Sequence, residues 1–291
     1  MKHFHSLKIG IFLLLISTGS FGQKTYLDLI GGYGFPMASQ SLVVTDGNSN
    51  TEDKLIKGTF GNGMNFGLGF GLKLANQIGI ELGASYFNSS TIKSHDETII
   101  RDATQIHEYE FSSSMFRLIP AFRLSTTHRH LNAYAKVGFL IGLNGYFEEI
   151  FINKYHSTYP SYHNDEFKIK SEYKGRLSTG FEGSLGFMYN VSQSFSFFIE
   201  ANGIAHSWAP KKSKITECTD NGTDILGSFT ISEREIEYEN QITETINPPD
   251  NEPTKSLKMY VPLSAIFINV GIQLRFGGDS KKKDAAAPQK N

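Results

Sequence analysis

The sequence predicts an all-β fold, namely an eight-stranded antiparallel transmembrane β-barrel with short periplasmic turns and long extracellular loops. Three observations support this fold class. Eight stretches alternate between apolar and small or polar residues with the period of two that is typical of a β-strand. The connections between these stretches are alternately long and short, as in outer-membrane barrels. The chain also begins with a segment that has the features of an export signal.

Residues 1–22 have the three parts of a secretory signal peptide. Lys2 and Lys8 lie in a basic start, residues 9–16 (IGIFLLLI) form an apolar core, and small residues precede the expected cleavage before Gln23. The apolar core is too short to cross a bilayer as a helix. We therefore expect an exported chain that enters a membrane through strands. The expected organisation is a signal peptide at 1–22, an outer-membrane barrel at 23–276 and a disordered periplasmic tail at 277–291.

The predicted strands share one plan, in which one parity of residues is apolar and faces lipid while the other faces the barrel interior. They are residues 26–35, 63–75, 78–86, a strand ending in 116–124, 131–147, 171–191, 195–208 and 260–276. The second is the most regular, since Met64, Phe66 and Leu68 alternate with polar residues and glycines. Pro120 cannot donate a hydrogen bond to a neighbouring strand, so we expect a bulge or local break there.

The connections give the topology. Short turns are expected at residues 76–77, 126–130 and 192–194, and long polar loops at 39–62, 89–107, 148–170 and 209–256. In outer-membrane barrels the short turns are periplasmic and the long loops extracellular. An even number of strands places both termini in the periplasm. Within the last loop, residues 229–246 alternate with Glu233, Glu235, Glu237 and Glu239 on one parity, which fits either a projecting β-ribbon or a flexible acidic loop.

Composition excludes several classes of protein. The formal net charge of −1 provides no basic field for nucleic acid. The single cysteine, Cys218, excludes an internal disulfide and a thiolate metal cluster, and we interpret it as an inert, exposed loop thiol.

The interior parity collects charged residues, and we predict that they form a structural charge network that seals the lumen. The predicted network consists of Asp28, Lys73, Glu81, Arg117, Arg123, Lys136, Glu182, Glu200 and Arg275. An eight-stranded barrel is normally filled by side chains, so these charges should pair. We expect Lys73 to lie nearly opposite Glu81, and Asp28 to neighbour Gln273 and Arg275 where the first and last strands meet. A gate or ion path is the alternative interpretation.

Neither a catalytic site nor a cofactor site is predicted. Glu182 and Glu200 could act as general acid and base, but their basic neighbours favour salt bridges. His206 and Ser207 are adjacent in a strand and therefore point to opposite faces. His156 and His163, with Asp165 or Glu166, match no tight metal-binding spacing, which favours solvated loop residues.

With these features in view, the chain resembles the outer-membrane β-barrel family common in Bacteroidota, including small OmpA/OmpX-like and PorT-like barrels. The resemblance covers residues 23–276 as a pattern and includes the closing run AIFINVGIQLRF, with Gly271, Ile272, Leu274 and Phe276. In that family such a strand is the signal for the barrel-assembly machinery. Here 15 residues follow it, so the signal is not strictly terminal.

These observations predict a non-enzymatic protein of the cell outer membrane that acts through its extracellular loops in adhesion, recognition or envelope support. The expected partners are outer-membrane lipid or lipopolysaccharide, the barrel-assembly machinery, and a protein or glycan ligand at the loops, without nucleic acid. The alternatives are a narrow channel or a secretion and transport accessory protein, and an outer-membrane lipid hydrolase.

Overall fold

The structure, a computed structural model, describes residues 25–37, 40–46, 53–100, 103–157, 165–175, 177–242 and 249–276, with backbone alone for 40–46, 53–58 and Ile100. The predicted signal peptide at 1–22 and tail at 277–291 lie outside these residues. Within them, no helix has the length and apolar character needed to cross a membrane.

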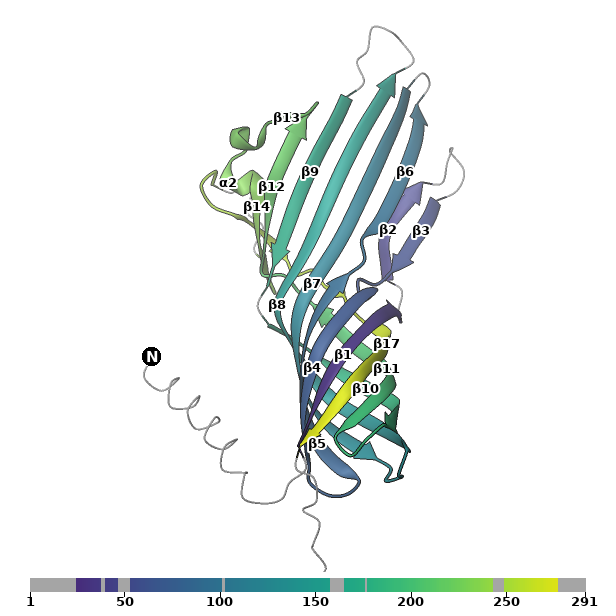
Figure 1. Cartoon of the computed structure of the whole chain (residues 1–291). Helices are drawn as coiled ribbons and strands as arrows, with labels where there is room; N and C mark the ends of the chain where they lie inside the picture. The colour runs from purple at the N-terminus through teal and green to yellow at the C-terminus, as the bar shows by residue number, and fades with distance from the viewer. Residues whose placement is uncertain are drawn as a thin grey trace, which may run out of the picture.

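Eight strands form a closed ring (Figure 1). They are β1 (Thr25–Pro36), β4 (Gly63–Lys73), β5 (Ile78–Ser89), β7 (Ala103–Ser125), β8 (Leu131–Ser157), β10 (Leu177–Asn190), β11 (Phe195–Trp208) and β17 (Ala265–Phe276). All neighbours are antiparallel, and β1 pairs with β17 along its whole length, from Thr25 opposite Phe276 to Pro36 opposite Ala265. This pairing closes the ring, which lets strands cross lipid because no edge remains unpaired.

An apolar belt surrounds the ring. Leu185 is 70% exposed, Phe122 68% and Val137 67%, and similar residues follow on the other strands. In water such a surface would be unfavourable, whereas in a bilayer it is the lipid-facing surface. The chain is thus an outer-membrane β-barrel, as the sequence predicted. The three short turns also lie where they were predicted, at residues 74–77, 126–130 and 191–194 between the paired strands.

The long connections, interpreted as polar loops from the sequence, contain further strands. They are β2 (Gln40–Asp46), β3 (Asp53–Gly58), β6 (Ile92–Ile100), β9 (Asp165–Lys174), β12 (Lys212–Asp220), β13 (Thr223–Asp224), β14 (Glu235–Glu239), β15 (Thr254–Leu257) and β16 (Val261–Pro262), with η2 (Leu226–Ser228) and α2 (Ile231–Arg234). These stretches resemble loops in sequence because most of them are rich in charged and polar residues and lack the alternation between apolar residues and glycine.

Most of these strands form one projecting sheet above the barrel, in the order β6-β7-β8-β9-β12-β14-β15 (Figure 1). β7 and β8 belong to both parts, since β8 is 27 residues long and pairs first with β10 and then with β9. The 12 residues of β8 above the barrel, Tyr146–Ser157, extend it by about 40 Å at about 3.3 Å per residue. Because the sheet lies at the end away from the short turns, it is extracellular.

A β-bulge in β8 marks the junction between barrel and sheet. Ser114 is opposite Tyr146 and Phe116 is opposite Leu143, so β8 holds one extra residue there. Asn144 takes a left-handed conformation with φ 50. Below the bulge, odd-numbered residues of β8 such as Val137 face lipid. Above it, odd-numbered residues such as Phe147 lie on the interior side, because a one-residue shift reverses the facing of every later side chain.

Pro120 causes a local gap, as expected. β5 pairs with it without a shift, at Leu82 opposite Pro120. On the other side, the pairing of β7 with β8 runs from Leu118 opposite Ile141 to Ala121 opposite Gly138, with no pairs in between and no change of register. The missing N–H donor therefore causes a short interruption in the pairing of β7 with β8.

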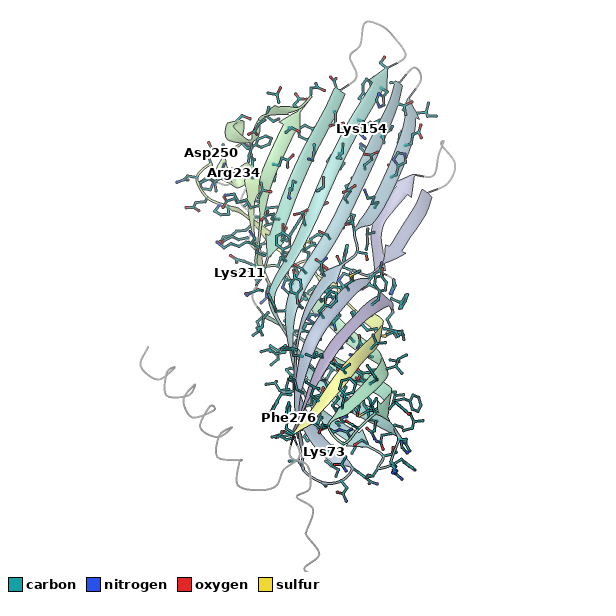
Figure 2. All side chains as sticks on the ribbon, viewed as in Figure 1. Lys73, Lys154, Lys211, Arg234, Asp250 and Phe276 are labelled. Atoms are coloured by element: carbon teal, nitrogen blue, oxygen red, sulfur yellow. The ribbon has the colours of Figure 1, made fainter. Side chains whose placement is uncertain are left out.

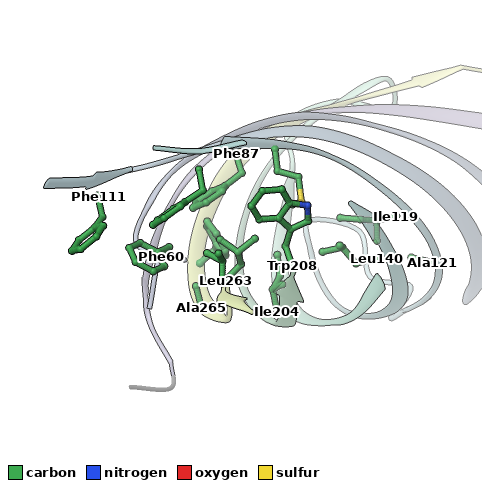
Figure 3. Packing of buried hydrophobic residues seen from close by; sticks show 14 residues of the cluster. Phe60, Phe87, Phe111, Ile119, Ala121, Leu140, Ile204, Trp208, Leu263 and Ala265 are labelled. Carbon is green, nitrogen blue, oxygen red and sulfur yellow. The ribbon is translucent and has the colours of Figure 1, made fainter. Parts of the chain in front are cut away.

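An apolar plug fills the extracellular end of the lumen (Figure 3). We use this name for Phe60, Phe87, Leu140, Ile204, Trp208, Leu263 and Phe267. The segment around Phe60 is held across the mouth because its backbone N–H donates to Pro262 O at 2.8 Å. The hydroxyl of Thr59 also donates to the Pro262 and Ser264 carbonyls, at 2.9 and 3.0 Å. The sequence interpretation missed this plug.

The close packing at the junction gives a prediction. A Cβ at Gly145 would lie 2.4 Å from ring atoms of Trp208, whereas a Cβ at Gly183, on the lipid-facing side, would meet nothing within 4 Å. We therefore expect Gly145→Val to lower the free energy of unfolding by about 1–3 kcal/mol, the usual cost of overpacking, and Gly183→Val to change it little. Urea unfolding in detergent micelles measures both. Equal effects would argue against the tight packing at Trp208.

Candidate functional site: the lumen and the projecting sheet

The lower lumen holds a connected cluster of ion pairs. Lys136 Nζ lies 2.8 Å from Glu200 Oε2 and 3.3 Å from Glu81 Oε1. Arg123 Nη1 lies 3.4 Å from Glu81 Oε2 and 3.2 Å from Asp28 Oδ2. All five side chains are buried. Glu81 thus joins the lysine and the arginine, and the cluster links five strands across the lumen, namely β1, β5, β7, β8 and β11.

Neutral groups complete this cluster. Tyr26 OH donates to Glu81 at 3.1 Å, and Gln273 Nε2 donates to Asp28 at 2.8 Å. The Arg123 guanidinium lies 4.0 Å from the centre of the Tyr134 ring and 5.0 Å from that of Tyr26. Buried charges are tolerated when they are paired and their remaining hydrogen-bonding positions are filled, which is the arrangement here.

The other predicted network residues are not part of these ion pairs. Glu182 is buried and accepts a hydrogen bond from Ser184 at 3.5 Å. Arg117 is buried, with its guanidinium 4.2 Å from the Phe87 ring centre, and among the described residues its nitrogens have no hydrogen-bond partner. Arg117 is therefore held below the plug by cation–π contact rather than by a salt bridge.

At the short-turn end, Lys73 and Arg275 are each offset by two residues from their expected neighbours, whereas Gln273 lies directly opposite Asp28, as expected. Lys73 is opposite Gly79 and Glu81 is opposite Gly71, so the two residues are offset along the strands. Asp28 is opposite Gln273, while Arg275 is opposite Tyr26 and donates to Ser192 O and Ser196 Oγ. These partners are decided by the register of each strand pair, which the residue pattern does not specify.

The lumen has little free space in the described residues. Two cavities of about 30 Å³ each lie inside it, one lined by Glu81, Lys136, Glu182 and Glu200 and the other near Tyr26 and Arg123. A volume of this size holds one or two water molecules. The ion cluster thus occupies the lower part of the lumen, and the plug occupies the upper part.

A serine–histidine pair lies inside the barrel, and the sequence interpretation missed it. Ser178 Oγ is 2.8 Å from His206 Nε2, whereas Ser207 faces outward, as parity predicted. Nδ1 of His206 is buried without a hydrogen-bond partner in the described part of the chain, so the third group that orients the base of a catalytic triad is absent there. Ser178 also contacts Met115, beside the plug. This geometry favours a structural pair.

The loop residues considered as metal ligands are separated. His156 lies in β8 opposite Thr104, Glu166 is paired with Lys154 in register, and His163 lies outside the described residues. Across the residues that the structure describes, no three His, Cys, Asp or Glu side chains gather as a metal site would require.

The projecting sheet has two contrasting faces. Its outer face continues the lipid-facing side of the barrel but is covered by lysine–glutamate pairs between strands. The pairs are Lys93–Glu110, Lys154–Glu108, Lys168–Glu217, Lys170–Glu148, Lys174–Glu172, Lys212–Glu237, Lys214–Glu235 and Lys255–Glu239. Figure 2 shows Lys154 on this sheet, far from Lys73 and Phe276 at the turn end.

The inner face, which continues the lumen side, is aromatic. Its rings are Tyr109, Phe111, Phe147, Phe151, Tyr155, Phe167, Tyr173 and Tyr238. Phe147 contacts both Phe60 of the plug, at 4.9 Å between ring centres, and Tyr173, at 5.1 Å. Tyr173 also donates to Glu149 at 2.6 Å. Burial and the neighbouring Glu149 carboxylate raise the pKa of Tyr109 and of Tyr173. The polarity of the two faces is thus the reverse of that in the barrel.

Two interpretations of the last long loop are resolved by this sheet. Residues 235–239 form β14, which pairs with β12 and β15, so the projecting-ribbon interpretation holds for this part, while Glu233 caps α2.

Cys218 is buried on the inner face rather than exposed, and burial raises the pKa of its thiol. The interpretation of Cys218 as an exposed loop thiol is therefore wrong.

Comparisons with known proteins give weak likenesses only. No family model matches the sequence, and no curated protein matches it. Among solved structures, Ail, the attachment invasion locus protein of Yersinia pestis, is 12% identical with a TM-score of 0.31, over 88% of this chain and 99% of that one. Acinetobacter baumannii CarO is 11% identical with a TM-score of 0.31, over 87% and 97%.

The outer membrane protease OmpT from Escherichia coli is 7% identical with a TM-score of 0.22, over 87% of this chain and 97% of that one. Similarity at this level carries no argument about activity. The assignment as an outer-membrane barrel follows from the closed ring and its apolar belt.

The lumen cluster gives a second prediction. Lys136→Met leaves Glu200 and one oxygen of Glu81 buried without their cation, so we expect a loss of about 3–5 kcal/mol in the free energy of unfolding. Lys93→Met removes a lysine from an exposed pair on the outer face and should cost less than about 1 kcal/mol. Urea titration of both variants tests this. A Lys136→Met loss no larger than that of Lys93→Met would contradict the cluster's role.

The outer face should respond to acid. The hydrogen bond from Lys154 lowers the pKa of Glu108. Burial alone would raise the pKa of Glu148, but hydrogen bonds from Tyr146 and Lys170 outweigh it and lower that pKa. A carboxylate whose folded-state pKa is lowered stabilises the fold above its unfolded pKa, about 4.3, and this contribution is lost as pH falls through the folded value.

We therefore expect β8 and β9 above the bulge to lose amide protection below about pH 4, by about 0.2–1 kcal/mol per pair. Hydrogen exchange corrected for intrinsic rates measures the change. The Glu148→Gln variant should be less sensitive to acid than the unchanged protein. Equal sensitivity in both proteins would argue against the pairs as the cause.

Proposed function

We propose that this protein is a non-enzymatic outer-membrane barrel with a closed lumen, and that it acts through its projecting sheet in adhesion, recognition or envelope support. The observation that carries the proposal is the contrast between the two halves. The barrel interior is filled by an ion cluster and an apolar plug, while β7 and β8 extend about 40 Å beyond it to build a sheet. A chain that only spanned the membrane would not need this sheet.

The alternatives receive less support. A narrow channel or secretion helper would use the charged lumen residues, but five of them are paired with one another and the cavities beside them measure only about 30 Å³ each. A lipid hydrolase would use the Ser178–His206 pair, which lacks an orienting group among the described residues.

The sequence resemblance is part of the proposal. Gly271, Ile272, Leu274 and Phe276 in β17 support relationship to the Bacteroidota barrels of the OmpA/OmpX-like or PorT-like kind. That relationship would make the barrel-assembly machinery a partner during insertion. Lipid or lipopolysaccharide would surround the belt, and a protein or glycan ligand would bind the sheet.

Photo-crosslinking on intact cells tests the recognition role. A photoreactive residue in place of Phe151, on the inner face of the sheet, should give protein or glycan adducts of discrete mass. The same residue in place of Val137, within the lipid-facing belt, should give lipid adducts instead. If Phe151 gives no macromolecular adduct while Val137 labels lipid as expected, the proposed recognition role fails.

A further inference from the structure

The distribution of charge over the projecting sheet is one-sided. Above the β8 bulge, every lysine of its described strands lies on the outer face, and no lysine or arginine of those strands lies on the inner face. The inner face nevertheless has carboxylates, notably Asp96 and Glu149. It is therefore an aromatic surface with negative charge and no basic group of its own in the described strands.

The carboxylates of the two faces differ in their partners. Glu148, on the outer side of β8, pairs with Lys170 at 3.0 Å. Glu149, the next residue, points to the inner face, where Tyr173 is its hydrogen-bond donor and no basic side chain of the described residues pairs with it. Among the described residues, the basic side chain that pairs with Asp96 is His107, with Nδ1 3.6 Å from Oδ2.

Unsatisfied polar atoms lie on the same face. Ser94 is 4% exposed, and its hydroxyl has no hydrogen-bond partner among the described residues. Oδ1 of Asp96, two residues further along β6, is likewise buried and unpartnered there. Buried polar atoms of this kind normally have partners, so a bound group that donates hydrogen bonds would satisfy them.

We propose that the inner face of the projecting sheet binds a basic polypeptide segment, whose lysine or arginine side chains lie against Asp96 and Glu149 and over the neighbouring rings. This rests on the proposed recognition function and names the chemistry of the partner. Aromatic faces attract cations, and the carboxylates supply the opposite charge. A neutral glycan offers no cation, and lipopolysaccharide phosphates or acidic glycans are repelled by this face.

The match between partner and surface is also one of length and shape. β9, which crosses the middle of the sheet, has 10 residues, so an extended segment of similar length can span the face. The rings are already held by one another, as in the stacked Tyr109–Phe111 pair at 6.0 Å. Because these side chains are already ordered, they lose little conformational entropy when a partner binds, which favours affinity.

Calorimetry with the full-length protein in lipid nanodiscs tests the proposal. The probe is a synthetic peptide of alternating lysine and threonine about as long as β9, compared with its glutamate–threonine counterpart and with maltohexaose as a neutral glycan. We expect the lysine peptide to bind and the other two probes not to bind. We also expect its affinity to fall with rising salt, because the contacts are ionic.

Adjacent residues provide the matched control. Glu149→Gln keeps an oxygen that can accept from Tyr173 but removes the charge, and it should weaken binding about tenfold, the scale of one partly screened charge contact. Glu148→Gln removes a charge from the opposite face and should leave the affinity within about twofold, since no inner-face contact changes. Equal weakening by both variants would show non-specific attraction and overturn the proposal.

Binding of maltohexaose or of the acidic peptide in place of the lysine peptide would also overturn it, as would no binding at all. These outcomes are separable from failure of the proposed function. If photo-crosslinks form from Phe151 on cells while the lysine peptide does not bind, the recognition role stands and the basic-polypeptide assignment fails.

Discussion

The small cross-section of an eight-stranded ring is the constraint on which the rest of the structure depends. Such a ring leaves an interior only wide enough for side chains. The interior must therefore be filled, and polar groups in it must find partners there. Lys136 and Arg123 satisfy the carboxylates of Glu81, Glu200 and Asp28 in the lower half. Aromatic and aliphatic residues around Trp208 fill the upper half.

At the membrane surface, the surroundings of the outer face change from lipid to water. Below it, Val137 and Leu185 face outward; above it, Lys154 and Glu108 do so. In β8 the reversal is produced by one extra residue at the Asn144–Gly145 bulge. Odd-numbered positions of β8 carry large apolar residues on both sides of the bulge, but they face lipid below it and the inner face of the sheet above it. The same strand can therefore serve first a membrane wall and then a sheet in water.

Much of the barrel could be predicted from the sequence because lipid imposes a simple pattern. Strands 63–73 and 265–276 alternate without interruption, and the short turns separate paired strands. The plug could have been predicted, since Phe87, Ile204 and Phe267 are large apolar residues at interior positions that are otherwise polar in their strands. The individual partners in the lumen could not have been predicted, because Asp28 contacts Arg123 and Gln273 through strand registers that no local sequence pattern specifies.

The projecting sheet was the main omission. Residues such as Glu108 and Tyr109 alternate as regularly as those of the barrel. Because the outward-facing positions of this sheet meet water, they carry charged residues, and the composition therefore resembles that of a loop. The Ser178–His206 pair was equally invisible, since its members are 28 positions apart and are brought together by the β10–β11 register.

The claim that the lumen is closed, so that the work is done outside the barrel, is tested most directly by conductance in planar lipid bilayers. We expect the inserted protein to carry no steady ion current, because the Lys136 cluster and the Trp208 plug fill the interior. Steady currents that are abolished by Glu200→Ala would contradict it, since they would place an ion path through the residues described here as a seal.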